Sequence, residues 1–106
     1  MLDGMFAALS DPTRRAVIHR LGQGPATVSE LAEPFPIALP SFMKHIRTLE
    51  ASGLIRSSKT GRVRTCTLRP ERFQPVADWL AAERELWHAR TDRLESIVTT
   101  TSNPSS

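Results

Sequence analysis

The chain has 106 residues, a length that suits one domain with a modest and mostly aliphatic core. Its single cysteine excludes an internal disulfide, and because it has neither a long apolar run nor a basic, apolar leader we expect a cytoplasmic protein with no membrane partner. The net charge of +3 arises from residues 36–72, where eight basic side chains stand against two acidic ones, a pattern that fits either a phosphate-facing surface or a merely solvated one.

The N-terminal part of the chain predicts two helices in succession. Apolar residues recur at helical spacing over residues 2–9. Ser10-Asp11-Pro12 then predicts a new helix start, because Ser or Asp accepts a hydrogen bond from an unpaired backbone N–H and Pro suits the first helical position. This second helix should run from about Pro12 to Leu21 and turn four residues inward: Ala16, Val17, Ile18 and Leu21.

Two further helices follow, and capping residues mark their ends. Thr27 and Glu30 match a capping box, so a short helix of about seven residues should begin there. Pro40 suits the first turn of another helix, from about Leu39 to Ser52, and Gly53 is a natural stop because glycine reaches the left-handed conformation without strain. Three residues form the inward stripe of this helix: Phe42, Ile46 and Leu49.

The last part of the chain predicts a hairpin and then a long helix. From Leu54 to Leu68 helical periodicity gives way to alternating β-branched and basic residues, with residues 59–62 as the tip of a hairpin. A long amphipathic helix should run from about Gln74 to Thr99. The polar tail, residues 99–106, should be disordered, so residues 1–98 would form a single domain.

This order of elements is typical of a winged helix-turn-helix, a mainly α-helical DNA-binding fold with a two-stranded wing. Three motifs resemble the ArsR/SmtB family of bacterial transcriptional repressors: LSDPTRR at residues 9–15, TVSELA at residues 27–32 and KHIRTLEASGLI at residues 44–55. The resemblance covers about residues 3–98. It implies a homodimeric repressor that binds double-stranded operator DNA and is released by an inducer, whose identity the sequence leaves open.

The resemblance also assigns the DNA-binding elements. The helix-turn-helix would be residues 28–52, with residues 39–52 as the recognition helix. Exposed side chains of such a helix reach base edges and phosphates when it lies in the major groove, while the wing contacts the backbone or the minor groove. The candidate DNA-binding residues are Leu39, Ser41, Met43, Lys44, His45 and Arg47 on the helix, and Lys59, Arg62 and Arg64 on the hairpin.

Two positions in this region depart from the family pattern, and two of the candidate residues allow a second interpretation. Ala38 stands where the family usually has a capping serine, which should weaken the helix start by about 1 kcal/mol. Met43 stands where serine is frequent, and its apolar side chain favours a thymine methyl group over a hydrogen-bonded base. His45 could instead hold the helix in place from a partly buried position, and Arg64 could form a salt bridge at a strand edge.

The sequence does not match the metal sites known in this family. Ala32 and Pro34 stand where the arsenic site has its cysteine pair, and Asp78-Trp79-Leu80 lacks the histidine of the zinc site on the last helix. Zinc takes four ligands, which three scattered histidines do not supply. These histidines are His19, His45 and His88. We therefore expect no metal and no cofactor.

Other functions would each require particular features of the sequence. A winged helix can be a protein–protein interaction module, although the basic centre argues against this use here. Cys66 could sense oxidants as a single thiol, but it shares strand parity with Leu68, which favours packing as a small hydrophobe. The sequence does not distinguish a transcriptional activator from a repressor. No Ser/His/Asp set, close carboxylate pair or phosphate-binding loop indicates an enzyme.

Apolar stripes on the first and the last helix predict a dimer. Together they offer more apolar surface than one small domain can cover, and the family resemblance also implies a two-fold pairing. The candidate interface residues are Leu2, Met5, Phe6 and Leu9 on the first helix, and Leu80, Trp87, Leu94 and Val98 on the last.

Overall fold

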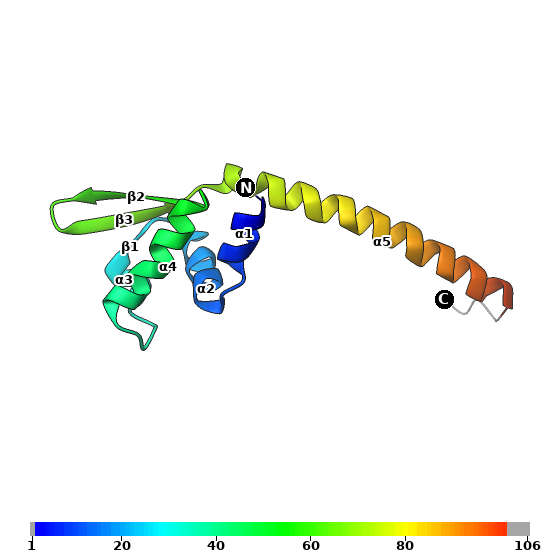
Figure 1. Ribbon diagram of the computed structural model, residues 1–106, viewed down its shortest axis with the longest axis horizontal. Helices are drawn as coiled ribbons and strands as arrows, with labels where there is room; N and C mark the ends of the chain where they lie inside the picture. Colours follow the sequence, from blue (N-terminus) through cyan, green and yellow to red (C-terminus); the bar gives the residue numbers. More distant parts are fainter. Residues whose placement is uncertain (1, 102–106) are drawn as a thin grey trace. The chain divides into compact units, whose positions relative to one another are not determined.

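A computed structural model describes residues 2–101 of the chain, including the side chains of residues 2–90. The chain up to Gln74 forms one compact unit, and the chain beyond it forms a second, made of the last helix. The α-helices, labelled in Figure 1, are α1 (Leu2–Leu9), α2 (Pro12–Leu21), α3 (Val28–Ala32), α4 (Leu39–Ala51) and α5 (Gln74–Thr101). The short 3-10 helix η1 (Pro70–Phe73) precedes α5. The strands are β1 (Ala26–Thr27), β2 (Ile55–Thr60) and β3 (Val63–Leu68).

The restart of the chain at α2 follows the predicted capping chemistry. The Asp11 carboxylate accepts a hydrogen bond of 3.0 Å from the backbone N–H of Arg14, and Pro12 occupies the first helical position. This hydrogen bond lowers the pKa of the Asp11 carboxyl. Val17 is buried as expected, whereas Ala16 is exposed, so the prediction that it faces inward is wrong.

The sheet has three strands, one more than the predicted two-stranded hairpin. The two residues of β1 pair antiparallel with β3, so the strand order is β1-β3-β2. The strand leads directly into the capping box of α3, where the Thr27 hydroxyl accepts from the Glu30 N–H and the Glu30 carboxylate accepts from the Thr27 N–H. This confirms the predicted box and fixes the start of α3 against the sheet.

Helix α4 is held by its buried face and by its C-terminal end. Phe42, Ile46 and Leu49 are fully buried, as predicted, and the Phe42 ring stacks on Phe35 with 5.6 Å between the ring centroids. After the helix, Gly53 adopts a φ of +83° and donates to Glu50, while the next N–H donates to Leu49. This is a Schellman motif, which ends the helix at the predicted glycine.

The N-terminal end of α4 lacks the side-chain cap that α2 and α3 have. Ala38 has the extended backbone conformation of a capping residue (φ −64°, ψ 145°), but no side chain accepts a bond from the first turn. We expect Ala38→Ser to stabilise the fold by about 1 kcal/mol and to raise the melting temperature by about 4–8 °C. Thermal denaturation followed by circular dichroism measures this.

The matched control for this substitution is Ala51→Ser, at the exposed last residue of the same helix. It adds the same hydroxyl where no helix start needs an acceptor, so it should leave the melting temperature unchanged or slightly lower. Equal gains in the two variants would show that the missing cap costs nothing.

The wing is the β2–β3 hairpin, whose tip is a two-residue turn. Thr60 pairs with Val63, and Gly61 between them has a φ of +63°, which suits the first central position of a type II′ turn. The hairpin extends beyond the helices of its unit (Figure 1). Its base is anchored by Ile55 and Cys66, which are both buried.

Helix α5 carries a row of exposed apolar side chains over its described part. It extends to Thr101, two residues beyond its predicted end, while residues 102–106 of the predicted tail lie outside the described residues. Four large apolar residues are exposed: Trp79, Leu80, Leu86 and Trp87. The side chains of Leu94 and Val98, two of the predicted interface residues, also lie outside the described part. None of the helices described here has the length and apolarity needed to cross a membrane.

Helix α1 divides its predicted interface residues between the interior and the surface. Met5 is only 2% exposed, so it is a core residue and cannot contact a second protein chain as it stands. Its neighbours Leu2, Phe6 and Leu9 are partly exposed. The first predicted interface stripe is therefore corrected to these three residues.

Candidate nucleic-acid interface

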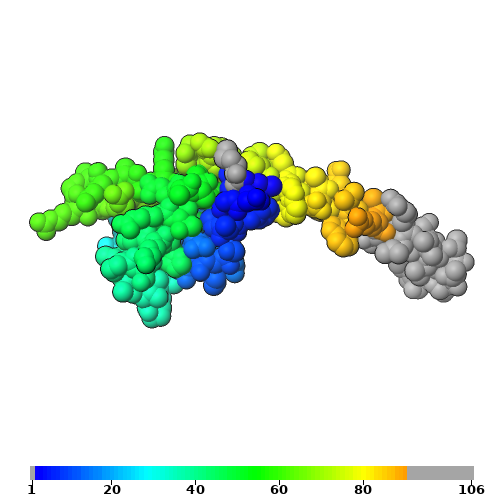
Figure 2. All heavy atoms as spheres, viewed as in Figure 1, coloured from blue at the N-terminus to red at the C-terminus, as the bar shows by residue number. Residues whose placement is uncertain are grey.

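A groove of about 400 Å³ lies between α4, the start of α3 and the wing. It brings together five of the nine residues that the sequence predicted to contact DNA. These are Leu39, Met43, Lys59, Arg62 and Arg64. Figure 2 shows the hairpin side of the groove as a projecting arm. The remaining lining residues are Thr27, Val28, Ser29 and Val63.

The outer face of α4 presents apolar and basic side chains in one row. Leu39, Met43 and Arg47 follow one another at intervals of four residues, so they share one face of the helix. Ser41 and Lys44 are exposed beside this row. The first turn of the helix contains no acidic residue, so nothing at its start repels a phosphate backbone.

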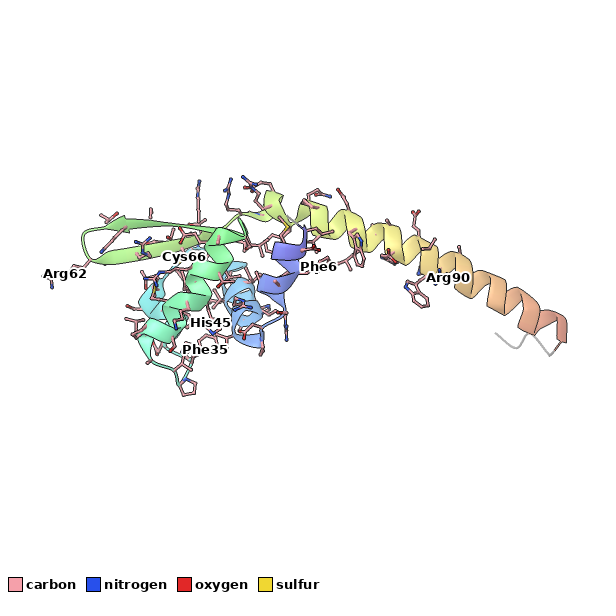
Figure 3. All side chains as sticks on the ribbon, in the orientation of Figure 1. Phe6, Phe35, His45, Arg62, Cys66 and Arg90 are labelled. Atoms are coloured by element: carbon pink, nitrogen blue, oxygen red, sulfur yellow. The ribbon has the colours of Figure 1, made fainter. Side chains whose placement is uncertain are left out.

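The tip of the wing presents two exposed cations. Lys59 is the last residue but one of β2, and Arg62 lies in the turn itself (Figure 3). Long cationic side chains on a projecting hairpin reach a phosphate backbone or a minor groove without moving the helices. The two cations and the outer face of α4 thus form one surface that suits a DNA duplex.

Arg64 is held within the protein rather than presented at the tip. Its guanidinium donates to the Ser57 hydroxyl over 2.8 Å, and that hydroxyl donates to the Glu50 carboxylate over 2.9 Å. The chain of bonds links β3 and β2 to the last turn of α4. Of the two interpretations of Arg64, this geometry favours the structural one, with a serine placed between the two charges.

His45 faces α2 rather than the outer surface of α4 (Figure 3). Its Nδ1 accepts a hydrogen bond of 3.1 Å from the Arg14 guanidinium, which carries donors only, and lies 3.7 Å from the Asp11 carboxylate. The geometry therefore favours the interpretation in which this histidine holds α4 in place.

Arg14 ties three segments together and was not singled out in the sequence. Besides His45, its guanidinium donates to the backbone carbonyls of Ala8 (2.6 Å) and Ala7 (3.0 Å) at the end of α1. Carbonyls at the end of a helix lack the usual partner in the next turn. The arginine supplies donors to both, although the Ala7 carbonyl also accepts from the N–H and the hydroxyl of Ser10. One side chain thus joins α1, α2 and α4.

We expect Arg14→Lys to destabilise the fold by about 2 kcal/mol, because an ammonium group cannot reproduce a planar fork of donors. Arg15→Lys is the matched control, since the side chain of the exposed Arg15 donates one hydrogen bond within the described residues, to the Leu9 carbonyl. It should cost less than about 0.5 kcal/mol. Urea unfolding of both variants measures the difference, and equal losses would contradict the assignment of Arg14 as the joint.

Cys66 is fully buried in β3, and burial raises the pKa of its thiol. Because the thiolate is the reactive form, a buried thiol with a raised pKa reacts poorly with oxidants. The structure therefore favours packing over oxidant sensing for this residue. Among the described residues, no group of three or more His, Cys, Asp or Glu side chains is placed to hold a metal ion.

The sequence missed five residues of this region. Four of them line the groove, and Arg14 anchors the helix that carries it; the four are Thr27, Val28, Ser29 and Val63. Ser29 lies two residues after the capping threonine, and its exposed place in the first turn of the helix-turn-helix was an available signal. Nothing in the local sequence reports the partners of Arg14, because they are brought together only by the tertiary fold.

The fold and this surface define a winged helix-turn-helix DNA-binding protein, and comparisons with known proteins support the class. A family model described as a helix-turn-helix domain matches residues 9–58. The HTH-type transcriptional regulator Rv2034 of Mycobacterium tuberculosis is 37% identical over 68 residues, which are 64% of this chain and 64% of that protein. The match thus spans less than two thirds of that relative. The transcriptional repressor SdpR of Bacillus subtilis is 30% identical over 79 residues, 74% of this chain and 88% of that protein.

Solved structures give the same result. A crystal structure of an ArsR family transcriptional regulator, RHA00566, is 64% identical, with a TM-score of 0.78 over 82% of this chain and 90% of that chain. The homodimeric winged helix-turn-helix DNA-binding domain Mb0332 of Mycobacterium bovis shares the fold at 18% identity, with a TM-score of 0.63 over 82% of each chain. The chain belongs to the ArsR family and is a DNA-binding transcriptional regulator, not an enzyme.

Proposed function

We propose that this protein is a homodimeric repressor that binds an inverted-repeat operator. The observation that carries the proposal is the surface formed by the outer face of α4 and the cationic tip of the wing, on either side of one groove. The repressor function of SdpR and the homodimeric state of Mb0332 support it.

In this proposal α4 lies in the major groove of the duplex. Lys44 and Arg47 contact phosphates or a guanine edge, while Ser41 and Met43 contribute to the choice of base. Lys59 and Arg62 contact the backbone or the minor groove beside the same half-site. His45 and Arg64, which are bonded within the protein, act by holding α4 and the wing in position.

The proposed dimer uses the apolar residues that the fold leaves on α1 and α5. On α1 they are Leu2, Phe6 and Leu9, and on α5 they are Leu80 and Trp87. The sequence pattern adds Leu94 and Val98 to the proposal. A two-fold axis would bring one recognition helix from each protomer to the same face of the duplex, with half-sites about 10 base pairs apart or a multiple of that.

Selection of bound duplexes from a random-sequence pool tests this proposal. The purified protein should enrich an inverted repeat with this spacing, and a reporter gene placed downstream of the recovered sequence should be expressed less when the protein is present. Enrichment of a single, unrepeated site would contradict the dimer, and increased reporter expression would make the protein an activator. Retention of no preferred sequence would defeat the proposal.

A further inference from the structure

Two apolar residues occupy the part of the recognition helix that should meet base edges. Leu39 is the first residue of α4 and is 54% exposed, and Met43 is one turn further on and partly exposed. Both line the groove that Lys59 and Arg62 line from the wing. Single exposed apolar residues are ordinary on protein surfaces, so it is their place that carries information. The N-terminal residues of a recognition helix are the ones that contact bases.

From this placement, and on the basis of the DNA binding proposed above, we infer that Leu39 and Met43 read the 5-methyl groups of thymine in the major groove. Neither side chain offers a strong hydrogen-bond donor or acceptor to a base edge. Each of the four bases presents hydrogen-bonding atoms in the major groove, but thymine alone adds a methyl group.

Contact of these side chains with a guanine or cytosine edge costs free energy, which makes the contact selective for thymine. An aliphatic or thioether side chain pressed against a guanine or cytosine edge removes water from polar base atoms and replaces none of their hydrogen bonds. Against a thymine methyl it buries apolar surface on both partners, which is favourable. The flanking Ser41 and Arg47 provide hydrogen bonds for the neighbouring bases or phosphates. Each half-site is therefore read in part through one or two thymines.

Replacement of thymine by deoxyuridine tests the inference, because it removes the methyl group and keeps every hydrogen-bonding atom. The probe is the duplex recovered by the selection described above, with each thymine of one half-site replaced in turn. We expect one or two replacements to weaken binding by about fourfold each, the effect of burying one methyl group, and the others to have no effect. Fluorescence anisotropy measures the affinities.

Variants of the protein test whether Leu39 and Met43 cause the loss of affinity for the deoxyuridine duplexes. In Leu39→Ala and Met43→Ala, the thymine duplex should bind more weakly, and the preference for thymine over uracil should fall toward one at the position that each residue reads. Met43→Leu, which keeps an apolar side chain, should retain the preference. Lys59→Ala is the matched control, because it should weaken both duplexes equally. Circular dichroism checks that each variant is folded.

Each other result overturns the inference. If no thymine in the half-site is sensitive to loss of its methyl group, the readout does not exist. If a sensitive thymine keeps its preference in both alanine variants, other residues read it. These outcomes leave the proposed function intact, whereas a protein that selects no sequence at all would remove the proposed function and the inference together.

Discussion

Raising the salt concentration from about 50 to about 200 mM should weaken operator binding by about 10⁴-fold. Four exposed cations lie on the proposed DNA surface of each protomer: Lys44, Arg47, Lys59 and Arg62. If all eight in a dimer neutralise phosphates, the logarithm of the affinity should fall with the logarithm of the salt concentration with a slope of about −7, since each contact releases condensed counterions. Titrations of the selected duplex at several salt concentrations measure the slope.

The wing tip provides the sharpest version of this experiment. Arg62→Ala should weaken binding about equally on all sequences and reduce the slope by about 1 per protomer, because a phosphate contact carries no sequence information. Arg72→Ala is a suitable control, since Arg72 is exposed in η1 and does not line the groove. A flat salt dependence in the unmodified protein would contradict the DNA-binding surface as a whole.

Breaking the proposed dimer should reduce operator affinity by about 10²- to 10⁴-fold, because the second half-site then loses the benefit of being tethered to the first. The double substitution Leu80→Glu and Trp87→Glu places two charges on one face of α5, where the unmodified residues are 51% and 60% exposed. Light scattering at micromolar concentration should show the 11.8 kDa monomer instead of a species of twice that mass.

The control for the dimer experiment uses the opposite side of the same helix. Ala81 and His88 are exposed and have the same spacing as Leu80 and Trp87, so Ala81→Glu with His88→Glu adds two carboxylates away from the apolar row. This control should remain dimeric and bind the operator normally. A monomeric mass for the unmodified protein would count decisively against the two-fold arrangement.

Local signals predicted the helices well because their ends are set by neighbouring residues. The capping role of Asp11, the capping box at Thr27 and the stop at Gly53 all depend on bonds within a few positions of the chain. Strand β1 was missed because two residues carry no periodicity, and its pairing with β3 depends on residues about forty positions away. Ala16 was misplaced because a small apolar residue is tolerated on either face of a helix.

The candidate site was predicted by residue type but not by role. Strand parity placed Arg64 on the side of the buried Cys66, yet its actual partners, Ser57 and Glu50, come from two other elements. Likewise, the sequence left His45 between two interpretations, and only the contact with Arg14 favours one of them. Side chains whose partners are distant in the sequence have no local pattern from which to predict them.

The short connection between α4 and the wing has a mechanical consequence. Only Ser52, Gly53 and Leu54 separate the two elements, and the Schellman bonds and the Glu50–Ser57–Arg64 chain bind them to each other. These bonds therefore hold α4 and the wing at a fixed distance from each other. Once DNA is bound as proposed, a duplex whose dimensions do not fit the distance between α4 and the wing must bend or change its groove width. The energy of this deformation depends on base-pair steps that no side chain touches, so flexible steps between the two contacts should strengthen binding.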